Sequence, residues 1–441
     1  MKKIITFCTI IMTCMNLPAQ NIAPEWSKDK VIYEVNIRQY TGEGTFEAFS
    51  QHLPRLKELG AGILWLMPVQ PIGVEKRKGS LGSYYSISDY TATNPEFGTM
   101  KEFKKLVDEA HKNGMYVILD WVANHSSFDN VWMKKNKDFY TTGADGKIIP
   151  PVADWSDVAD FNYDNMEMRR QMIEAMKFWL KETGVDGFRC DVAMMVPDDF
   201  WKDCFTELKA MKPDIFLLAE AEGKQFIEMG FHMVYGWKAH HLLNKIAQGK
   251  TTVNKLDSLI QHDITTYPAG SYWMNFTSNH DENSWNGSEF ERMGDAAQTM
   301  AVIAATIPGM LLIYSGQEVA LNRRLKFFDK DSITWNQNLD YTEFYQKLST
   351  LKKENPALWN GSYGGTYKRI ETGDADVFGF VREKDGNKIL VLINTVDGVQ
   401  KVEIKNEPGK YVETFSGKKV KMKEKFAVEM KPLGFAVMVM K

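Results

Sequence analysis

Residues 116–125 indicate the architecture of the chain and read Tyr116-Val117-Ile118-Leu119-Asp120-Trp121-Val122-Ala123-Asn124-His125. It starts as a continuous apolar run and ends in polar side chains. A continuous apolar run is typical of a strand buried on both faces of a parallel sheet. Amphipathic helical patterns separate this run from others like it along the chain. The eight runs are Val31–Val35, Ile63–Met67, Tyr116–Val122, Gly187–Val192, Ile215–Ala221, Met233–Trp237, Ser271–Thr277 and Met310–Ser315.

The alternation of runs and helices indicates an α/β architecture. Thr99 and Glu102 have the spacing of a capping box, which predicts the start of a helix. Eight strand–helix units over residues 30–355 predict a closed (β/α)8 TIM barrel. An open, doubly wound sheet is the alternative. Its dinucleotide fingerprint is missing, because Gly60-Ala61-Gly62 precedes a strand instead of following one.

Two segments depart from the alternation. A long stretch rich in Asp, Gly and Pro follows the third run, and we predict that residues 125–157 form a small inserted domain. Short strands separated by turn signals predict a C-terminal antiparallel β-sandwich over residues 356–441. The barrel then comprises residues 21–124 and 158–355. The sandwich strands expected are Thr366–Ile370, Val377–Val381, Ile389–Asn394, Lys401–Ile404, Phe426–Met430 and Phe435–Met440.

Composition and charge exclude several classes of function. The 441 residues carry 54 Lys and Arg against 57 Asp and Glu, a net charge of −3. This balance argues against a nucleic-acid partner and against a polybasic membrane patch, and we expect a monomer. Aromatic residues reach 12%, which suits sugar binding, although core filling explains the number equally well. We expect Cys190 and Cys204 to be buried thiols, because no Cys/His cluster has zinc spacing.

The first residues are typical of an export signal. Lys2 and Lys3 precede an apolar run from Ile4 to Met15, and small residues follow it, so residues 1–20 are predicted to be a signal peptide. The run is shorter than the roughly 20 residues of a membrane span, and no other stretch resembles one. We therefore expect an exported protein, periplasmic or extracellular. Lipidation of Cys14 stays open.

Polar side chains end four of the predicted barrel strands. Because the carboxyl ends of barrel strands meet at one mouth, these side chains are expected to converge there. Taken singly, an Asp near an Arg is most often a structural ion pair, and a His at a strand end is most often scaffolding. Together they favour a ligand site, because burying several charges is costly without one. The residues are Asp120, His125, Arg189, Asp191, Glu220, His280 and Asp281.

Two carboxylates in unlike environments are what glycoside hydrolysis requires. Arg189 lies two residues from Asp191 on the same face of a strand and would keep that carboxylate ionised, which favours Asp191 as the nucleophile. Glu220 follows an apolar run, has no basic neighbour in the sequence and is the better acid. Asp281 is left to hold the sugar hydroxyls.

The four strand ends resemble the four signature regions of the α-amylase superfamily, in the same order. The resemblance covers essentially the whole chain after residue 20. It implies that Asp191 is the nucleophile, Glu220 the general acid/base and Asp281 the transition-state stabiliser. It further implies that His125 and His280 bind the sugar at the cleaved end and that Arg189 positions the nucleophile. Asp120 would then lie behind the site. Tyr85, four residues before Asp89, would form the sugar platform.

The sequence also departs from the family. Many α-amylases carry Lys-His where this chain has Met194-Met195, which predicts weak binding on the leaving side of the substrate. Asn124 matches a family calcium ligand, and Asn162 stands where another ligand is often Asp. We therefore hypothesise one structural calcium ion near Asn124, with Asp160 or Asn162 and backbone carbonyls as further ligands. A side chain that only bonds its own loop is the alternative for Asn124. No organic cofactor is expected.

The resemblance implies a secreted, retaining glycoside hydrolase. It would cleave α-glucosidic bonds, mainly α-1,4, in starch-derived glucans and maltooligosaccharides by double displacement. An exo-acting oligosaccharide α-glucosidase and an α-glucanotransferase are alternatives that would use the same catalytic residues. A non-catalytic sugar-binding member is the remote alternative, since such members usually lose part of the carboxylate triad that this chain retains.

Overall fold

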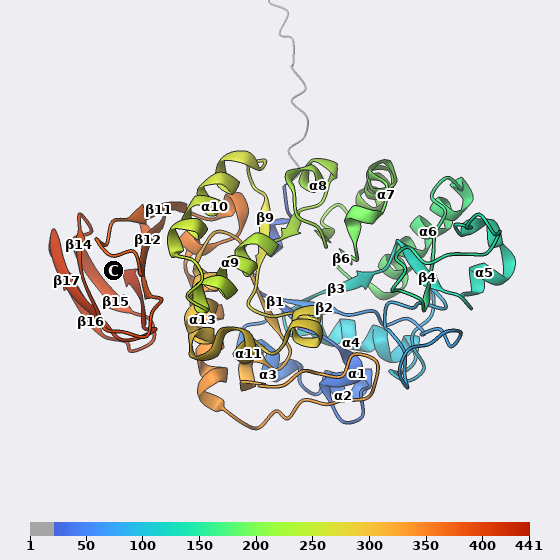
Figure 1. The fold of residues 1–441 in the computed structure, drawn as a ribbon, viewed down its shortest axis with the longest axis horizontal. Helices are drawn as coiled ribbons and strands as arrows, with labels where there is room; N and C mark the ends of the chain where they lie inside the picture. The colour runs from blue at the N-terminus through green and yellow to red at the C-terminus, as the bar shows by residue number, and fades with distance from the viewer. Residues whose placement is uncertain (1–21) are drawn as a thin grey trace, which may run out of the picture.

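The computed structural model describes residues 22–441, so the predicted signal peptide lies outside the described residues. Eight parallel strands form a closed barrel at the centre of the molecule (Figure 1). Each barrel strand pairs with the barrel strands that come before and after it in the sequence, and β10 closes the barrel against β1. The barrel prediction is confirmed. Its strands are β1 (Ile32–Val35), β2 (Ile63–Leu66), β3 (Tyr116–Trp121), β6 (Gly187–Cys190), β7 (Phe216–Ala219), β8 (Met233–Tyr235), β9 (Tyr272–Asn275) and β10 (Met310–Tyr314).

Helices surround the barrel. The predicted capping box is present, because Thr99 and Glu102 exchange hydrogen bonds at the start of α4. Among the described residues, no helix has the length and apolar character that crossing a membrane requires. The helices are α1 (Ile37–Tyr40), α2 (Phe46–Ser50), α3 (Leu53–Leu59), α4 (Met100–Lys112), α5 (Val131–Lys135), α6 (Met166–Thr183), α7 (Asp198–Met211), α8 (Lys224–Met229), α9 (Trp237–Ala247), α10 (Val253–Thr266), α11 (Glu289–Met293), α12 (Ala297–Thr306) and α13 (Leu339–Glu354).

The barrel interior is filled by side chains. Ile32, Trp65, Ile118 and Phe216 belong to one buried cluster that joins strands across the barrel. Each side chain is completely buried, so the barrel is a packed core and not a pore. Cys190 and Cys204 are buried free thiols, as predicted.

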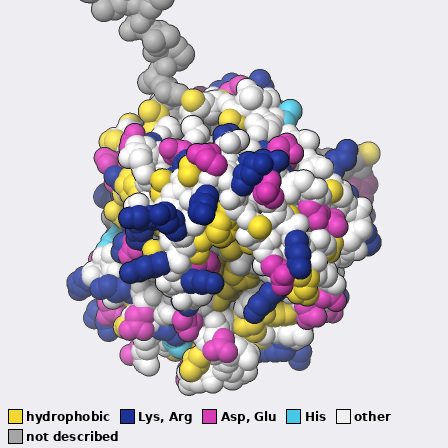
Figure 2. Space-filling view, turned by 90° about the vertical axis from the view of Figure 1, so that its left-hand side faces the viewer, with side chains coloured by type: hydrophobic (Ala, Val, Ile, Leu, Met, Phe, Trp, Pro, Cys, Tyr) yellow, Lys and Arg dark blue, Asp and Glu magenta, His cyan; other side chains and the backbone are white. Residues whose placement is uncertain are grey.

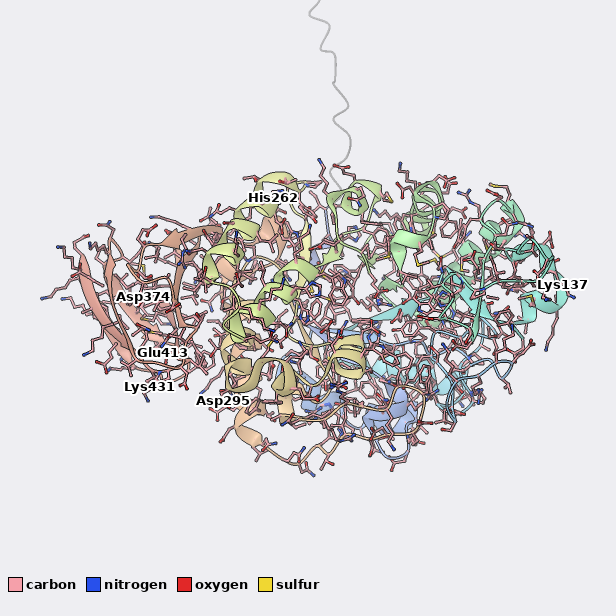
Figure 3. The ribbon with its side chains drawn as sticks, in the orientation of Figure 1. Lys137, His262, Asp295, Asp374, Glu413 and Lys431 are labelled. Atoms are coloured by element: carbon pink, nitrogen blue, oxygen red, sulfur yellow. The ribbon has the colours of Figure 1, made fainter. Side chains whose placement is uncertain are left out.

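The segment that follows β3 leaves the barrel. β4 (His125–Ser127) pairs antiparallel with β5 (Val158–Asp160), and α5 lies within the excursion between them. This segment forms the end of the molecule on the right of Figure 1, where Figure 3 labels Lys137. The pair β4–β5 brings the start and the end of the excursion together beside the end of β3.

The C-terminal region forms the opposite end of the molecule, where Figure 3 labels Asp374, Glu413 and Lys431. A six-stranded antiparallel sheet, in the order β11-β12-β13-β18-β15-β16, accompanies the two-stranded sheet β14–β17. Basic and acidic side chains are mixed on this face, around a strip of hydrophobic ones (Figure 2). The strands are β11 (Thr366–Ile370), β12 (Val377–Lys384), β13 (Asn387–Asn394), β14 (Gln400–Lys405), β15 (Gly409–Glu413), β16 (Lys419–Met422), β17 (Lys425–Met430) and β18 (Phe435–Met440).

The sandwich prediction is confirmed, but the sequence analysis missed two of its strands. β15 buries only Tyr411 and β16 buries only Met422. No apolar run therefore marks either strand in the sequence. Arg382 connects this region to the barrel, because its buried Nη1 donates a hydrogen bond to the carbonyl oxygen of Thr306 in α12 (3.1 Å).

Candidate active site

A cavity of about 500 Å³ lies at the carboxyl ends of the barrel strands. All the residues predicted to act on or bind the sugar line it, except Arg189, which is buried behind its floor. The structure thus brings together side chains that lie up to 196 positions apart in the chain, from Tyr85 to Asp281. The predicted residues that line the cavity are Tyr85, His125, Asp191, Glu220, His280 and Asp281.

Strand register places the two proposed catalytic carboxyl groups side by side. Cys190 of β6 lies opposite Ala219 of β7. Asp191 and Glu220 each come one residue later, and the backbone N–H of Glu220 donates to the carbonyl oxygen of Cys190 (2.9 Å). Both side chains therefore leave the barrel at the same height on neighbouring strands.

Arg189 contacts three carboxyl groups. Its Nη1 donates hydrogen bonds to Oδ1 of Asp191 and Oδ1 of Asp120, both at 2.8 Å. The predicted pairing with Asp191 is present. Its Nη2 lies 3.0 Å from Oε1 of Glu220, close enough for an ion pair. Glu220 has no basic neighbour in the sequence, but it has one in the structure. The pairing of β6 with β7 brings Arg189 next to it, so the expectation of a site without a basic neighbour is wrong.

The two proposed catalytic carboxyl groups nevertheless differ in acidity. Burial raises the pKa of Glu220 to about 8, and the charge of Arg189 offsets only part of this effect. Burial raises the pKa of Asp191 to about 6, again against the charge of Arg189. At neutral pH the first group holds a proton and the second is ionised. This is the division between acid and nucleophile that glycoside cleavage needs.

Val192 connects the two groups through its backbone. It has φ 35° and ψ 47°, a left-handed conformation that β-branched residues rarely adopt. In this conformation its N–H donates a hydrogen bond to Oε2 of Glu220 (2.6 Å). The residue directly after Asp191 therefore holds the carboxyl group of Glu220, which ties the position of each group to the other.

His280 lies at the centre of a second polar network. Its Nδ1 is 2.5 Å from Oε1 of Glu34, and its Nε2 is 2.8 Å from the hydroxyl of Tyr85 and 3.3 Å from Oδ2 of Asp281. Burial lowers the pKa of His280, but the charges of Asp281 and Glu34 outweigh burial and raise it to about 9. The ring is therefore an imidazolium at neutral pH. The Tyr85 hydroxyl donates to Oδ2 of Asp120 (3.0 Å).

His125 is in the opposite charge state. Burial lowers its pKa to about 3, so the ring is neutral. Its Nδ1 lies 3.2 Å from the amide nitrogen of Asn124, and an amide nitrogen can only donate, which places the ring proton on Nε2. The ring lies 5.5 Å from that of Trp155, between centroids. The two predicted sugar-binding histidines thus offer a neutral donor and a cationic donor.

The cavity walls come from residues to which the sequence analysis gave no role, some of them in the predicted inserted domain. The ring of Trp285 is 5.2 Å from that of Phe327, and Trp285 is 53% exposed. On another wall, Nζ of Lys78 lies 3.1 Å from Oδ1 of Asp157 and donates to the carbonyl oxygen of Asp154 (2.6 Å). Aromatic residues in loops after strand ends were the available signal. The unassigned lining residues include Lys78, Asp154, Trp155, Asp157, Trp285, Phe327 and Phe328.

The two predicted calcium ligands show no preformed metal site. The side chain of Asn162 bonds within its own loop, because Oδ1 accepts from the N–H of Asp164 (3.1 Å) and Nδ2 donates to the carbonyl oxygen of Asp138 (3.3 Å). Asn124 bonds His125. Within residues 22–441, no group of three or more His, Cys, Asp or Glu side chains is placed to hold a metal ion. The predicted ligands are mainly amide and backbone carbonyl oxygens, which this finding does not test, and calcium stays a prediction.

The fold and site together define a class of protein. A (β/α)8 barrel whose strand ends carry a protonated and an ionised carboxyl group around one cavity has the architecture of a glycoside hydrolase. The family described as "Alpha amylase, catalytic domain" matches residues 27–149 and 152–370. The chain belongs to this family, an α-amylase-type glycoside hydrolase family.

Individual relatives agree with this assignment. The chain is 27% identical over 392 residues to the α-amylase MalA of Haloarcula japonica, a match that covers 84% of this chain and 56% of that protein. An α-amylase structure from Lactobacillus plantarum has a TM-score of 0.84 at 31% identity and covers 94% of this chain and 100% of that one. A maltogenic α-amylase structure from Thermotoga neapolitana has a TM-score of 0.86 at 27% identity, with coverage of 94% and 99%.

Proposed function

We propose that the protein is a retaining hydrolase of α-glucosidic bonds, mainly α-1,4, in starch-derived glucans and maltooligosaccharides. The observation that carries this proposal is the pair Asp191 and Glu220, which directly follow neighbouring strands and differ in pKa. The names of the similar proteins, which are α-amylases and a maltogenic α-amylase, support the substrate class.

In the first step, the ionised carboxylate of Asp191 attacks C1 of the sugar and forms a covalent glycosyl ester. Glu220 gives its proton to the glycosidic oxygen, so that the leaving sugar departs as a neutral alcohol. Arg189 holds Asp191 in place through Nη1, and the N–H of Val192 holds Glu220 through Oε2.

In the second step, Glu220 is a carboxylate and accepts a proton from water, which attacks C1 and releases Asp191. Two displacements at C1 retain the anomeric configuration. Positive charge develops on the sugar ring in both transition states, and Asp281 is the carboxylate at the cavity placed to stabilise it. His280 and the Tyr85 ring supply a hydrogen-bond donor and an apolar face beside Asp281.

The walls suit a glucan. Glucose rings have apolar faces of C–H groups and rims of hydroxyl groups, so they pack on aromatic rings and bond to charged side chains. Trp155, Trp285 and Phe327 supply the aromatic surfaces, and Lys78 and Asp157 supply charged groups at the same cavity. We further propose that the protein is exported, on the strength of the signal-like residues 1–20.

Product analysis tests the proposal. The purified protein is incubated with soluble starch, pullulan and maltotriose, and products are separated by chromatography while proton NMR follows the anomer first formed. We expect shorter maltooligosaccharides with the α-configuration from starch, and no turnover by Asp191→Asn. Initial release of the β-anomer, or no cleavage of any of these glucans, would contradict the proposal.

The same products separate the alternatives. An exo-acting α-glucosidase would release glucose from soluble starch without intermediate maltooligosaccharides and would convert maltotriose through maltose to glucose. A glucanotransferase would form chains longer than the substrate. The catalytic residues are common to all three activities, so the product pattern distinguishes them where the carboxyl groups do not.

A further inference from the structure

Glu34 is a carboxylate inside the barrel that the proposed mechanism does not use. It lies on β1, where the residues on either side, Tyr33 and Val35, are also completely buried. Its carboxyl group is fully buried, and burying a charge is costly unless the charge is paired. Its pairing partner is therefore informative.

That partner is His280, 246 positions away in the chain. Oε1 of Glu34 lies 2.5 Å from Nδ1 of His280 and 3.4 Å from the backbone N of the same residue. Within the part of the chain that the structure describes, Oε2 of Glu34 has no hydrogen-bond partner. The carboxyl group is thus directed at one imidazole and one backbone N–H of a single residue.

A carboxylate on one imidazole nitrogen decides what the other nitrogen does. The proton on Nδ1 stays between Glu34 and the ring, and the ring plane is held by this bond. Nε2 then carries the second proton toward the hydroxyl of Tyr85 and Oδ2 of Asp281. The charges of Glu34 and Asp281 favour the cation, and that of Arg189 opposes it. The carboxyl group of Asp120, which accepts from the Tyr85 hydroxyl, also interacts with the charge of His280.

We propose that Glu34 is a positioning residue that keeps His280 doubly protonated and aims its Nε2–H into the sugar-binding cavity. A residue needed only for packing at this point of β1 would be apolar, as Ile32 is. The carboxylate instead makes the cavity side of His280 a charged donor in a fixed orientation. The inference rests on the proposed function for its kinetic readout, but not for its spectroscopic one.

The first test uses the unaltered protein. The ring of His280 is titrated by NMR of histidine-labelled protein, with its signals assigned from the spectrum of His280→Gln. We expect a midpoint above pH 8 in the unaltered protein. A midpoint below pH 7 would overturn the proposal, whatever the protein hydrolyses.

The second test removes the charge and keeps the shape. In Glu34→Gln the side-chain oxygen still accepts from Nδ1–H, so the ring orientation is conserved. Loss of an adjacent opposite charge shifts a pKa by about 1–3 units. We therefore expect the titration midpoint of His280 to decrease by an amount in this range. The ratio of variant to parent kcat/KM then drops at least about twofold between pH 6.5 and pH 8, because less of the imidazolium remains.

Glu318→Gln is the matched control. Glu318 is equally buried and accepts a hydrogen bond from the Tyr33 hydroxyl (2.6 Å), away from the cavity. We expect it to lower the melting temperature and to leave the His280 midpoint unchanged. Equal shifts in both variants, or no shift in Glu34→Gln, would overturn the proposal.

If Glu34→Gln does not fold, Glu34→Asp is measured instead. It retains the charge, so its His280 midpoint must stay above pH 7. If Glu34→Gln shifts the His280 midpoint but the unaltered protein cleaves no glucan, the proposed function is refuted and the role proposed for Glu34 stands.

Discussion

Replacing Glu220 by glutamine separates proton donation from the other roles of this side chain. Oε2 of Glu220 accepts from the N–H of Val192, and Oε1 faces Nη2 of Arg189. A glutamine oxygen can keep the first contact, but its NH2 group then faces the guanidinium as donor against donor. The substitution therefore removes the acid and also disturbs the ground state. A comparison between substrates isolates the acid, because the disturbance is common to all of them.

The magnitude follows from the protonation state. With a pKa of about 8, Glu220 is protonated in about nine-tenths of the molecules at pH 7. General acid catalysis contributes typically 10²–10⁴-fold, or about 2.7–5.5 kcal/mol of barrier. We expect Glu220→Gln to lower kcat/KM on maltooligosaccharides by a factor in this range. Aryl α-maltosides with acidic phenols need little proton donation, and the loss on them is expected to be less than about tenfold.

The assay is a series of aryl α-maltosides whose phenols differ in acidity, measured with parent and variants. The control is Glu222→Gln, since Glu222 does not line the cavity and accepts instead from the N–H of Lys238 (3.1 Å). We expect a steep dependence on leaving group for Glu220→Gln and a flat one for the parent and the control. A steep dependence for Glu222→Gln together with a flat one for Glu220→Gln would refute the assignment of the acid.

Three further outcomes are expected. If calcium binds near Asn124, excess EDTA lowers the melting temperature; an unchanged melting curve and no metal in the purified protein would end that hypothesis. If Met194 and Met195 lie on the leaving side of the substrate, as the resemblance to the family implies, they offer only apolar contacts there, and kcat/KM is expected to rise little from maltotriose to maltoheptaose; a steep rise would show an extended site. Burial lowers the pKa of His232 to about 3, below its unfolded value of about 6.5, so its contribution to stability is present above pH 6.5 and is lost as the pH falls toward 3. The free energy of unfolding, measured with urea at pH 7, 6, 5 and 4, should therefore have a smaller slope against pH in His232→Gln, with the difference approaching about 1.4 kcal/mol per pH unit between pH 5 and pH 4. Parallel curves for parent and variant would contradict this.

The barrel could be predicted from the sequence because its strands are buried on both faces. A strand that is buried on both faces has a nearly continuous apolar sequence, and Tyr116–Trp121 is an example. β15 and β16 could not be predicted in this way, because each buries only one side chain and exposes one lysine (β15) or two (β16). Their place in the sheet depends on β18, with which β15 pairs at Tyr411–Glu413.

The floor of the site could be predicted and its walls could not. Asp191, Glu220 and Asp281 follow strands, so the fold places them. Glu34 is the one acidic residue in the apolar run Val31–Val35, so the sequence shows it. Its proposed role could not be predicted, because that role depends on a contact with His280. Loop residues such as Trp285 have no strand to place them, and a pattern of neighbours along the chain does not show which loops meet.

The three carboxyl groups around Arg189 leave the cavity floor short of positive charge. When Asp120 and Asp191 are both ionised, one guanidinium faces two full negative charges and the carboxyl group of Glu220. A sugar-shaped ring that carries a protonated amine would supply the missing cation. Such compounds should bind more tightly than neutral sugars of the same shape, as mimics of the positive charge that develops at C1. Their affinity should weaken as the pH falls below about 6, where Asp120 and Asp191 take up protons.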